Sequence, residues 1–302
     1  MVVVLAFAAN ILVALAKTAA AIITGSASLL AEAAHSWADA GNEVFLLVAD
    51  RRASRERDDA HPLGHGREAY VWALFAAFGV FTVGAVVAVA NGIQELIHPE
   101  PTTNYAVAYI VLGVSAVLEG ASLAQSVVKA RRAARGLRRD TIDYVLNGSN
   151  ATLRAVVAED TAALAGLAVA ALGVGLHQAT GLSAFDAAGS IVIGLILAAV
   201  ALLLIDRNRR YLVGLEPPAF IRRQAGSSLL GNPGIERVTY LHLEFVGPSQ
   251  LFLVAAVDLT GDAPEDEVAR RLRRLEEAIE EDPLIQTAVL TLSVSDEESL
   301  TF

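Results

Sequence analysis

Four polar side chains recur along one apolar stretch of the sequence, between Leu29 and Ala49. They are Glu32, His35, Asp39 and Glu43, at steps of three, four and four residues, which places them within an arc of about 80° on one helix face. Three carboxylates at the centre of a membrane helix cost about 8 to 10 kcal/mol, and the apolar residues around them offset only about 2 to 4 kcal/mol. The stripe must therefore face other helices, water or a bound ion.

Further ionisable residues lie in other apolar stretches. Glu159 and Asp160 stand in VVAEDTAALAG, and Glu119 stands in VLEGAS. Neighbouring residues of a helix point about 100° apart, so we expect one of the first two to face His35, with Asp160 favoured and Glu159 second. Lys17, in the first apolar stretch, needs a carboxylate partner or a water-filled cavity. The alternative for the whole set is hydrogen bonding between helices that only holds the bundle together.

The chemistry open to these residues is limited by what the sequence lacks. It has no cysteine, so a metal must bind His, Asp, Glu or backbone oxygen, which favours borderline or hard divalent ions over Cu(I). It also has no Walker-type phosphate loop, no GxSxG and no HExxH. ATP-driven pumping and hydrolysis therefore find no support, and an ion gradient is the expected driving force.

The elements that would position these residues are membrane-spanning helices. Hydrophobic residues make up 54% of the 302, as expected of an integral membrane protein. Six spans are predicted: Val2 to Thr24, Leu29 to Ala49, Tyr70 to Leu96, Tyr105 to Val128, Leu153 to Leu176, and Phe185 to Ile205.

Loop charges predict the orientation of these spans. Five Arg lie between positions 51 and 67, and six Lys or Arg lie between 129 and 139. The opposite loops, near Gly25, at 98–104 and at 177–184, have none. The positive-inside rule then places both termini in the cytoplasm, which agrees with an even number of spans.

The sequence changes character after the last span, and we expect a transmembrane domain over 1–213 and a cytosolic domain over 214–302. The predicted order of the second domain is αββαβ, a small α+β fold. Its elements are a helix over 218–230, strands over 235–246 and 251–259, a helix over 264–281 and a strand over 285–294. From Glu216 onward, seven Arg stand against sixteen Asp and Glu. This acidic tail argues against a nucleic-acid partner.

A second group of potential ligands lies in the loop before the third span. Asp58, His61 and His65 are spaced so that a short loop could wrap them around one ion. The alternative is that Gly64 and Gly66 form a turn to which the histidines only donate hydrogen bonds. The tail offers only His242, so no full metal site is predicted there, and we expect this residue to be solvated or at a dimer interface.

These residues together resemble the cation diffusion facilitator family. The resemblance covers nearly the whole chain and rests on the HxxxD pair His35 and Asp39, the segments GSASLLAEAAHSWADAGN, DDAHPLGHGRE and IQELIHPEP, and the order of six spans followed by αββαβ. It implies a homodimer in the bilayer with a ferredoxin-like cytosolic domain, and exchange of divalent metal for protons. Zinc is the first expectation for the substrate, with manganese, iron and cobalt next. It implies neither enzymatic activity nor an organic cofactor.

The resemblance also assigns roles to residues. His35, Asp39 and Asp160 match the transport site, while Val156 stands where the family has its first fifth-span ligand. This departure resembles the branch whose fifth span reads Glu-Asp. Candidates for the missing ligand are Glu159, Glu32, Glu119, Asn42 and water. The loop residues Asp58, His61 and His65 match a second metal site of the family.

Two other classes of function stay open at this point. Val156 and the poor tail site motivate a membrane metal sensor or scaffold that does not transport. A membrane-embedded hydrolase is a more distant alternative, because no recognised catalytic arrangement accompanies the buried acids. The frequent use of Ala and Arg suggests a GC-rich bacterial gene and hence the bacterial cytoplasmic membrane, with a eukaryotic organelle membrane as the alternative.

Overall fold

The computed structural model describes residues 2–99, 103–136 and 139–302, and the side chains of these residues except 2–6, 8 and 9. Parts of the predicted loops at 98–104 and 129–139 therefore lie outside the described residues. The chain divides into two compact units, Met1–Asp50 with Val71–Arg209, and Arg51–Tyr70 with Arg210–Phe302.

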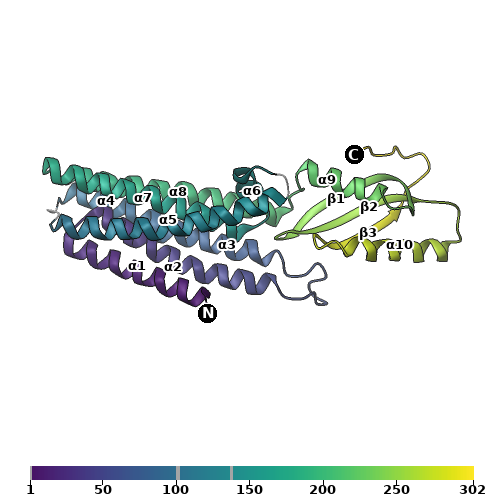
Figure 1. The fold of residues 1–302 in the computed structure, drawn as a ribbon, viewed down its shortest axis with the longest axis horizontal. Coiled ribbons are helices and arrows are strands. Elements are labelled where there is room, and N and C mark those ends of the chain that lie inside the picture. The colour runs from purple at the N-terminus through teal and green to yellow at the C-terminus, as the bar shows by residue number, and fades with distance from the viewer. Residues whose placement is uncertain (1, 100–102, 137–138) are drawn as a thin grey trace. The chain divides into compact units, whose positions relative to one another are not determined.

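The first unit is a bundle of long helices (Figure 1). Its helices are α1 (Val2–Thr24), α2 (Ala27–Ala53), α3 (Glu68–Gly79), the π-helical segment η1 (Val80–Val86), α4 (Val87–Ile97), α5 (Tyr105–Gly136), α6 (Thr141–Asn147), α7 (Ala151–Thr180) and α8 (Ala184–Val213). Helices cover each of the six apolar ranges expected from the sequence.

Four helical segments in the described part of the chain are long and apolar enough to cross a bilayer. They are Glu68–Ile97, Tyr105–Gly136, Ala151–Thr180 and Ala184–Val213. Helix α1 has a shorter apolar segment, Asn10–Thr24, and α2 carries the polar stripe. Six spans therefore remain a prediction, whereas a helical membrane domain is established.

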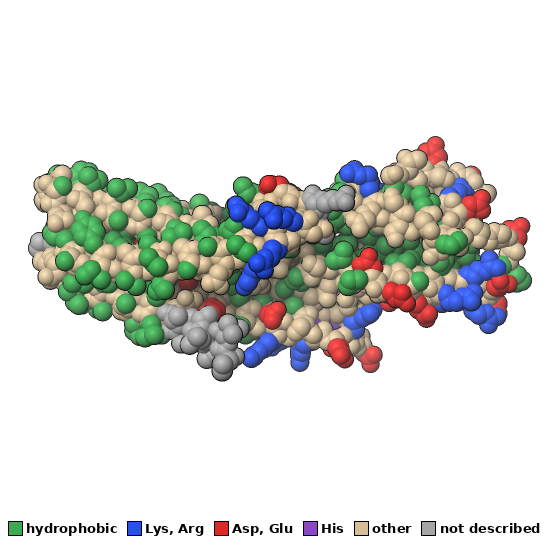
Figure 2. Space-filling model, viewed as in Figure 1, with side chains coloured by type: hydrophobic (Ala, Val, Ile, Leu, Met, Phe, Trp, Pro, Cys, Tyr) green, Lys and Arg blue, Asp and Glu red, His purple; other side chains and the backbone are tan. Residues whose placement is uncertain are grey.

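The bundle places small residues inside and large apolar residues outside. Ala88, Ala108 and Ala170 are fully buried, while Ile22 and Val117 are 77% and 72% exposed. Green hydrophobic side chains cover much of the helical surface seen in Figure 2. This distribution is typical of helices that pack closely with one another and face lipid.

Two glycines bring α8 against the continuous helical segment formed by η1 and α4. A Cβ at Gly92 would lie 2.7 Å from the carbonyl oxygen of Ala187, and one at Gly194 would lie 2.9 Å from that of Ala85. Between them, Ser190 Oγ donates a hydrogen bond of 2.8 Å to the carbonyl of Ala88. The two backbones are thus close enough that a side chain at either glycine would push them apart.

The second unit contains a three-stranded sheet and two helices. Its elements are α9 (Ala219–Leu230), β1 (Ile235–Gly247), β2 (Gln250–Leu259), α10 (Glu265–Glu280) and β3 (Ile285–Leu292). Strand β1 pairs antiparallel with β2, which pairs parallel with β3. The observed order αββαβ agrees with the sequence prediction. Alternate residues of β1 and β2, among them Leu243 and Leu253, are buried.

The loop between α2 and α3 belongs to this second unit. Arg57 Nη1 donates to Thr287 Oγ1 at 2.9 Å, and Arg67 forms an ion pair with Glu244 of β1. A Cβ at Gly66 would lie 2.6 Å from the carbonyl oxygen of Val246, so the loop backbone lies directly against the end of β1. The loop is therefore held in place by the C-terminal sheet.

The close approach at Gly92 predicts a difference between two glycine substitutions. Gly92→Ala should destabilise the protein by about 1 to 3 kcal/mol, because the new methyl group meets backbone atoms that cannot rotate away. Gly113→Ala is the matched control, since a Cβ there meets nothing within 4 Å, and the better helix propensity of Ala should leave stability unchanged or higher. The measurement is the temperature at which half of the protein in detergent is no longer monodisperse. Equal midpoints for the two variants would contradict the packing argument.

Candidate metal transport site

The start of helix α2 is fixed by an aspartate of α8. Asp186, which is buried, accepts hydrogen bonds from Ser26 Oγ at 3.0 Å, from the backbone nitrogen of Ala27 at 2.7 Å and from that of Ser28 at 3.3 Å. These donors include backbone groups of the first helical turn, which otherwise lack partners. Asp186 therefore sets the position of the helix that carries the polar stripe.

His35 and Asp39 lie together on α2, as their spacing predicts. Nδ1 of His35 is 3.3 Å from Oδ1 of Asp39, but the geometry is not that of a hydrogen bond, and neither ring nitrogen nor this oxygen has a hydrogen-bond partner. His35 is fully buried. Buried polar atoms are nearly always hydrogen-bonded, so these unsatisfied atoms are candidates for binding an ion or a proton.

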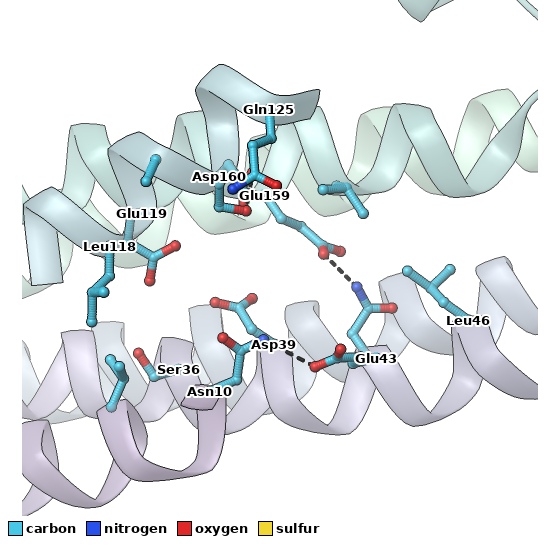
Figure 3. A pocket seen from close by; sticks show the side chains of 15 residues that line it. Asn10, Ser36, Asp39, Glu43, Leu46, Leu118, Glu119, Gln125, Glu159 and Asp160 are labelled. Carbon is cyan, nitrogen blue, oxygen red and sulfur yellow. Dashed lines mark hydrogen bonds between the residues drawn. The ribbon is translucent and has the colours of Figure 1, made fainter. Parts of the chain in front are cut away.

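A cavity of about 430 Å³ lies beside this pair, between α1, α2, α5 and α7. Figure 3 shows Ser36 and Asp39 facing Glu119 and Asp160 across it. The lining residues are Asn10, Val13, Ser36, Asp39, Asn42, Glu43, Leu46, Leu118, Glu119, Ala121, Ser122, Gln125, Val156, Glu159 and Asp160. Of the described residues that line the cavity, five are carboxylates and none is basic, which suits it to a cation.

The two acids of α7 turn toward different helices. The buried Glu159 accepts a hydrogen bond from the side-chain amide of Asn42 on α2, whereas Asp160 accepts one of 2.9 Å from Ser122 Oγ on α5. Glu159 thus makes the hydrogen bond to α2, and the expectation that Asp160 is the acid facing His35 stays a prediction. Val156, one turn earlier, also lines the cavity but offers no ligand atom.

The membrane residues do not form a closed ligand set in this structure. Within the described ranges, the only three His, Asp or Glu side chains whose ligand atoms all lie within 4.8 Å of one another are Asp58, His61 and His65. His35 does not line the cavity, although Asp39 beside it does. A metal held by His35, Asp39 and the acids of α7 would therefore require these side chains to move closer together.

Several cavity residues were missed in the sequence analysis. Ser122 and Gln125 follow Glu119 at steps of three, a spacing that places all three on one face of α5 and could have revealed them. Asn10 of α1 also lines the cavity and donates a hydrogen bond of 2.9 Å to Glu43. An isolated Asn in an apolar run gives a weaker signal.

Lys17 has a carboxylate partner rather than a water-filled cavity. Its Nζ lies 3.0 Å from Oε2 of Glu32 and 4.0 Å from Oε1 of Glu119. Both Lys17 and Glu32 are fully buried. Glu32, the first member of the polar stripe, thus joins α2 to α1 by a buried ion pair.

The loop group Asp58, His61 and His65 belongs to the second unit. Asp58 Oδ1 is 2.9 Å from His61 Nδ1, and Oδ2 is 3.1 Å from His65 Nε2. These hydrogen bonds, first that of His61 and then that of His65, lower the pKa of Asp58 to about 2. Because its pKa is lowered, the stabilisation they give is present above the ordinary aspartate range near about 4 and is lost as the pH falls through about 2.

This loop forms the glycine turn expected as one alternative, and metal binding there stays a prediction. Gly64 has a positive φ of 76°, so a glycine turn is present, and Asp58 accepts backbone hydrogen bonds from Ala60 and His61 within it. The same turn gathers one carboxylate and two imidazoles at distances that suit a shared ion. In the tail, His242 Nε2 lies 3.8 Å from Glu244 Oε2, outside this group.

Apolar helices around a carboxylate-lined cavity describe a membrane protein with a candidate cation site. Comparison with known proteins identifies its family. Residues 3–213 match the cation efflux transmembrane domain. The chain therefore belongs to the cation efflux family, also called the cation diffusion facilitators, whose members are transporters and not enzymes.

Three relatives match between 42% and 82% of this chain, in each case over about half of the relative's own length. Metal tolerance protein C4 of Arabidopsis thaliana is 33% identical over 248 residues, 82% of this chain and 54% of that protein. The mitochondrial proton-coupled zinc antiporter SLC30A9 of Homo sapiens is 32% identical over 247 residues, 81% of this chain and 43% of that protein. The cation-efflux pump FieF of Escherichia coli is 33% identical over 132 residues, 42% of this chain and 43% of the pump. The chain thus spans about half the length of these relatives.

Proposed function

We propose that this protein exports divalent metal cations from the cytoplasm in exchange for protons. The observation that carries the proposal is the cavity in which carboxylates of α2, α5 and α7 face one another. Beside it, His35 and Asp39 offer buried atoms that have no hydrogen-bond partner. Membership of the cation efflux family supports a metal ion as the transported substrate.

The transported ion is held by His35 and Asp39 of α2 together with Asp160 and Glu159 of α7. Glu159 takes the place of the ligand missing at Val156, since its carboxylate already contacts α2 through Asn42. Zinc is the first choice of substrate, because the similar human protein is named a zinc antiporter. Manganese, iron and cobalt are the next choices, because a carboxylate-rich set of ligands also suits harder ions.

Proton exchange follows from the charge that must cross the membrane. In a domain of six spans with both termini in the cytoplasm, the bound ion would lie between an access route from the inside and one from the outside. Moving two positive charges outward against an inside-negative potential costs about 4.6 kcal/mol per 100 mV, and each returning proton offsets about 2.3 kcal/mol. The carboxylates bind the metal when deprotonated and carry protons on the return. The protein acts as a homodimer in a bacterial cytoplasmic membrane.

A second divalent ion binds in the loop at Asp58, His61 and His65. This proposal rests on the convergence of their ligand atoms within 4.8 Å. The Arg57 and Arg67 side chains fix the surrounding loop on the C-terminal sheet, so the ligands are held in place by contacts outside the group.

A sensor or scaffold that no longer transports is the second candidate, favoured by Val156. This side chain lines the cavity without a ligand atom, so the site has lost one donor of the family pattern.

Carboxylate neutralisation should abolish transport. Asp39→Asn and Asp160→Asn should each lower metal uptake into inside-out proteoliposomes at least about tenfold, because each removes a charged ligand. Asp50→Asn, an exposed carboxylate of the same helix α2, is the matched control and should transport like wild type. The measurement is initial uptake of zinc and of manganese under an imposed pH gradient. Undiminished transport by both cavity variants, or transport that does not depend on the pH gradient, would contradict the proposal.

A substitution at Val156 separates the transporter from the sensor. For a transporter with an altered ligand set, wild type is active and Val156→His changes the ratio of zinc to manganese uptake. For the sensor, wild type is inactive and Val156→His creates transport. Val156→Leu keeps the site apolar and is the control for changed volume. The same proteoliposome assay distinguishes the two outcomes.

The proposed loop site predicts that removal of one loop ligand lowers metal binding in the loop. Substitutions in the transport site should not have this effect. His65→Asn should lower zinc affinity at this site at least about tenfold by removing one of three ligands. His242→Asn, which changes a histidine of the same unit outside the group, should bind like wild type. Isothermal titration of the purified full chain with zinc measures both. Identical titrations for the two variants would exclude the loop site.

A further inference from the structure

Lys17 is a buried cation that the transport mechanism does not use. It lies in α1, and its ammonium contacts carboxylates from two other helices, Glu32 of α2 at 3.0 Å and Glu119 of α5 at 4.0 Å. Lys17 and Glu32 are fully buried, whereas the Glu119 side chain is 18% exposed and lines the cavity. The ammonium therefore occupies a position between two acids, one of which opens to the proposed path of the metal.

One carboxylate oxygen of Glu32 is left without a hydrogen-bond partner inside the bundle. Its Oε2 faces Lys17, but its Oε1 is buried without a hydrogen-bond partner. This second oxygen lies against Gly166 of α7, where a Cβ would collide with it. A side chain there would displace the carboxylate, so the glycine leaves room for an acid that extends between three helices.

We propose that the Glu32 and Glu119 pair is a second cation position next to the transport cavity, filled by Lys17 Nζ in place of a free ion. The inference rests on the proposed function, because it takes the cavity beside Glu119 to be the metal site. The tethered ammonium limits this region to one exchangeable ion. With oxygen as the only ligand atom, the uncovered position would take a hard divalent cation such as Mn²⁺.

The geometry favours this role over an ion pair that only joins two helices. An ion pair between α1 and α2 needs one acid, and Glu32 alone supplies it at 3.0 Å. The second acid, Glu119, faces the same ammonium from the cavity side. A lysine ammonium is a compact point charge, comparable to a bound monovalent ion. Removing it leaves two carboxylates beside an open cavity.

The test counts metal ions on the purified full chain. Wild type, Lys17→Met, Lys17→Arg and Lys17→Met/Glu32→Gln are equilibrated with Mn²⁺ by dialysis, and bound metal per chain is measured by elemental mass spectrometry. Lys17→Met should bind one more ion than wild type. Lys17→Arg, which keeps the charge, and the double variant, which removes one of the two acids, should bind no additional ion. An unchanged count in Lys17→Met, or an equal gain in the double variant, overturns the inference.

Two further measurements distinguish failure of the inference from failure of the proposed transport site and from simple loss of the fold. Asp39→Asn should lower the wild-type count by one; if it does not, the proposed transport site fails and the inference fails with it. If Lys17→Met loses its fold in metal-free buffer, it is purified in excess Mn²⁺. Recovery of monodisperse protein only with metal supports the inference, because the ion then replaces the ammonium, whereas aggregation despite the metal overturns it.

Discussion

The structure depends on one constraint, that ionisable groups buried among apolar helices must be paired, hydrogen-bonded or able to hold an ion. An uncompensated buried charge costs several kcal/mol, and the bundle meets this cost at several places. Lys17 pairs with Glu32, Asn42 donates to Glu159, and Ser122 donates to Asp160. His35 and Asp39 have buried atoms that no hydrogen bond satisfies, and so does one oxygen each of Glu32 and Glu159. Several of the atoms at which the constraint is left open therefore belong to the residues that are proposed to bind an ion.

The packing of the bundle serves the same constraint. Alanine and glycine in the core let the helix backbones approach closely, so that short side chains such as Ser122 and Asp160 reach one another between helices. Asp186 fixes the first turn of α2 by accepting hydrogen bonds from its backbone. The stripe on α2 contacts α1 through Glu32 and Glu43, and Asp39 lines the cavity together with acids of α5 and α7. Large apolar side chains would fill the cavity that the small residues leave.

The extent of prediction from sequence differs between the two units for physical reasons. Apolar runs and alternation are local signals, and they predicted the helical ranges and the αββαβ order. The loop at 51–70 was assigned to the connection between spans, yet Arg67 pairs with Glu244, which is 177 residues away in the chain, and no local pattern encodes such a contact. Within the site, helical periodicity showed that Glu159 and Asp160 point in different directions, but not which one hydrogen-bonds to α2. That contact depends on Asn42, whose amide reaches Glu159 only once the helices have packed. Ser122 and Gln125 could have been predicted, because they follow Glu119 at steps of three residues.

The excess of acid in the cavity gives a physical reason for exchange with protons. Asp39, Glu119, Glu159 and Asp160 all line it, and Lys17 lies beside Glu119. A divalent ion neutralises two carboxylates and the ammonium is already shared with Glu32, so at least one acid needs a hydrogen bond or a proton even when metal is bound. When the ion leaves, its ligands would remain charged in a medium of low dielectric constant unless protons replace it. Neutral ligands such as histidine or water would impose no such requirement. The proposed replacement of the ligand missing at Val156 by the carboxylate of Glu159 would keep an acid in that place, and this acid would need a proton once the ion has left.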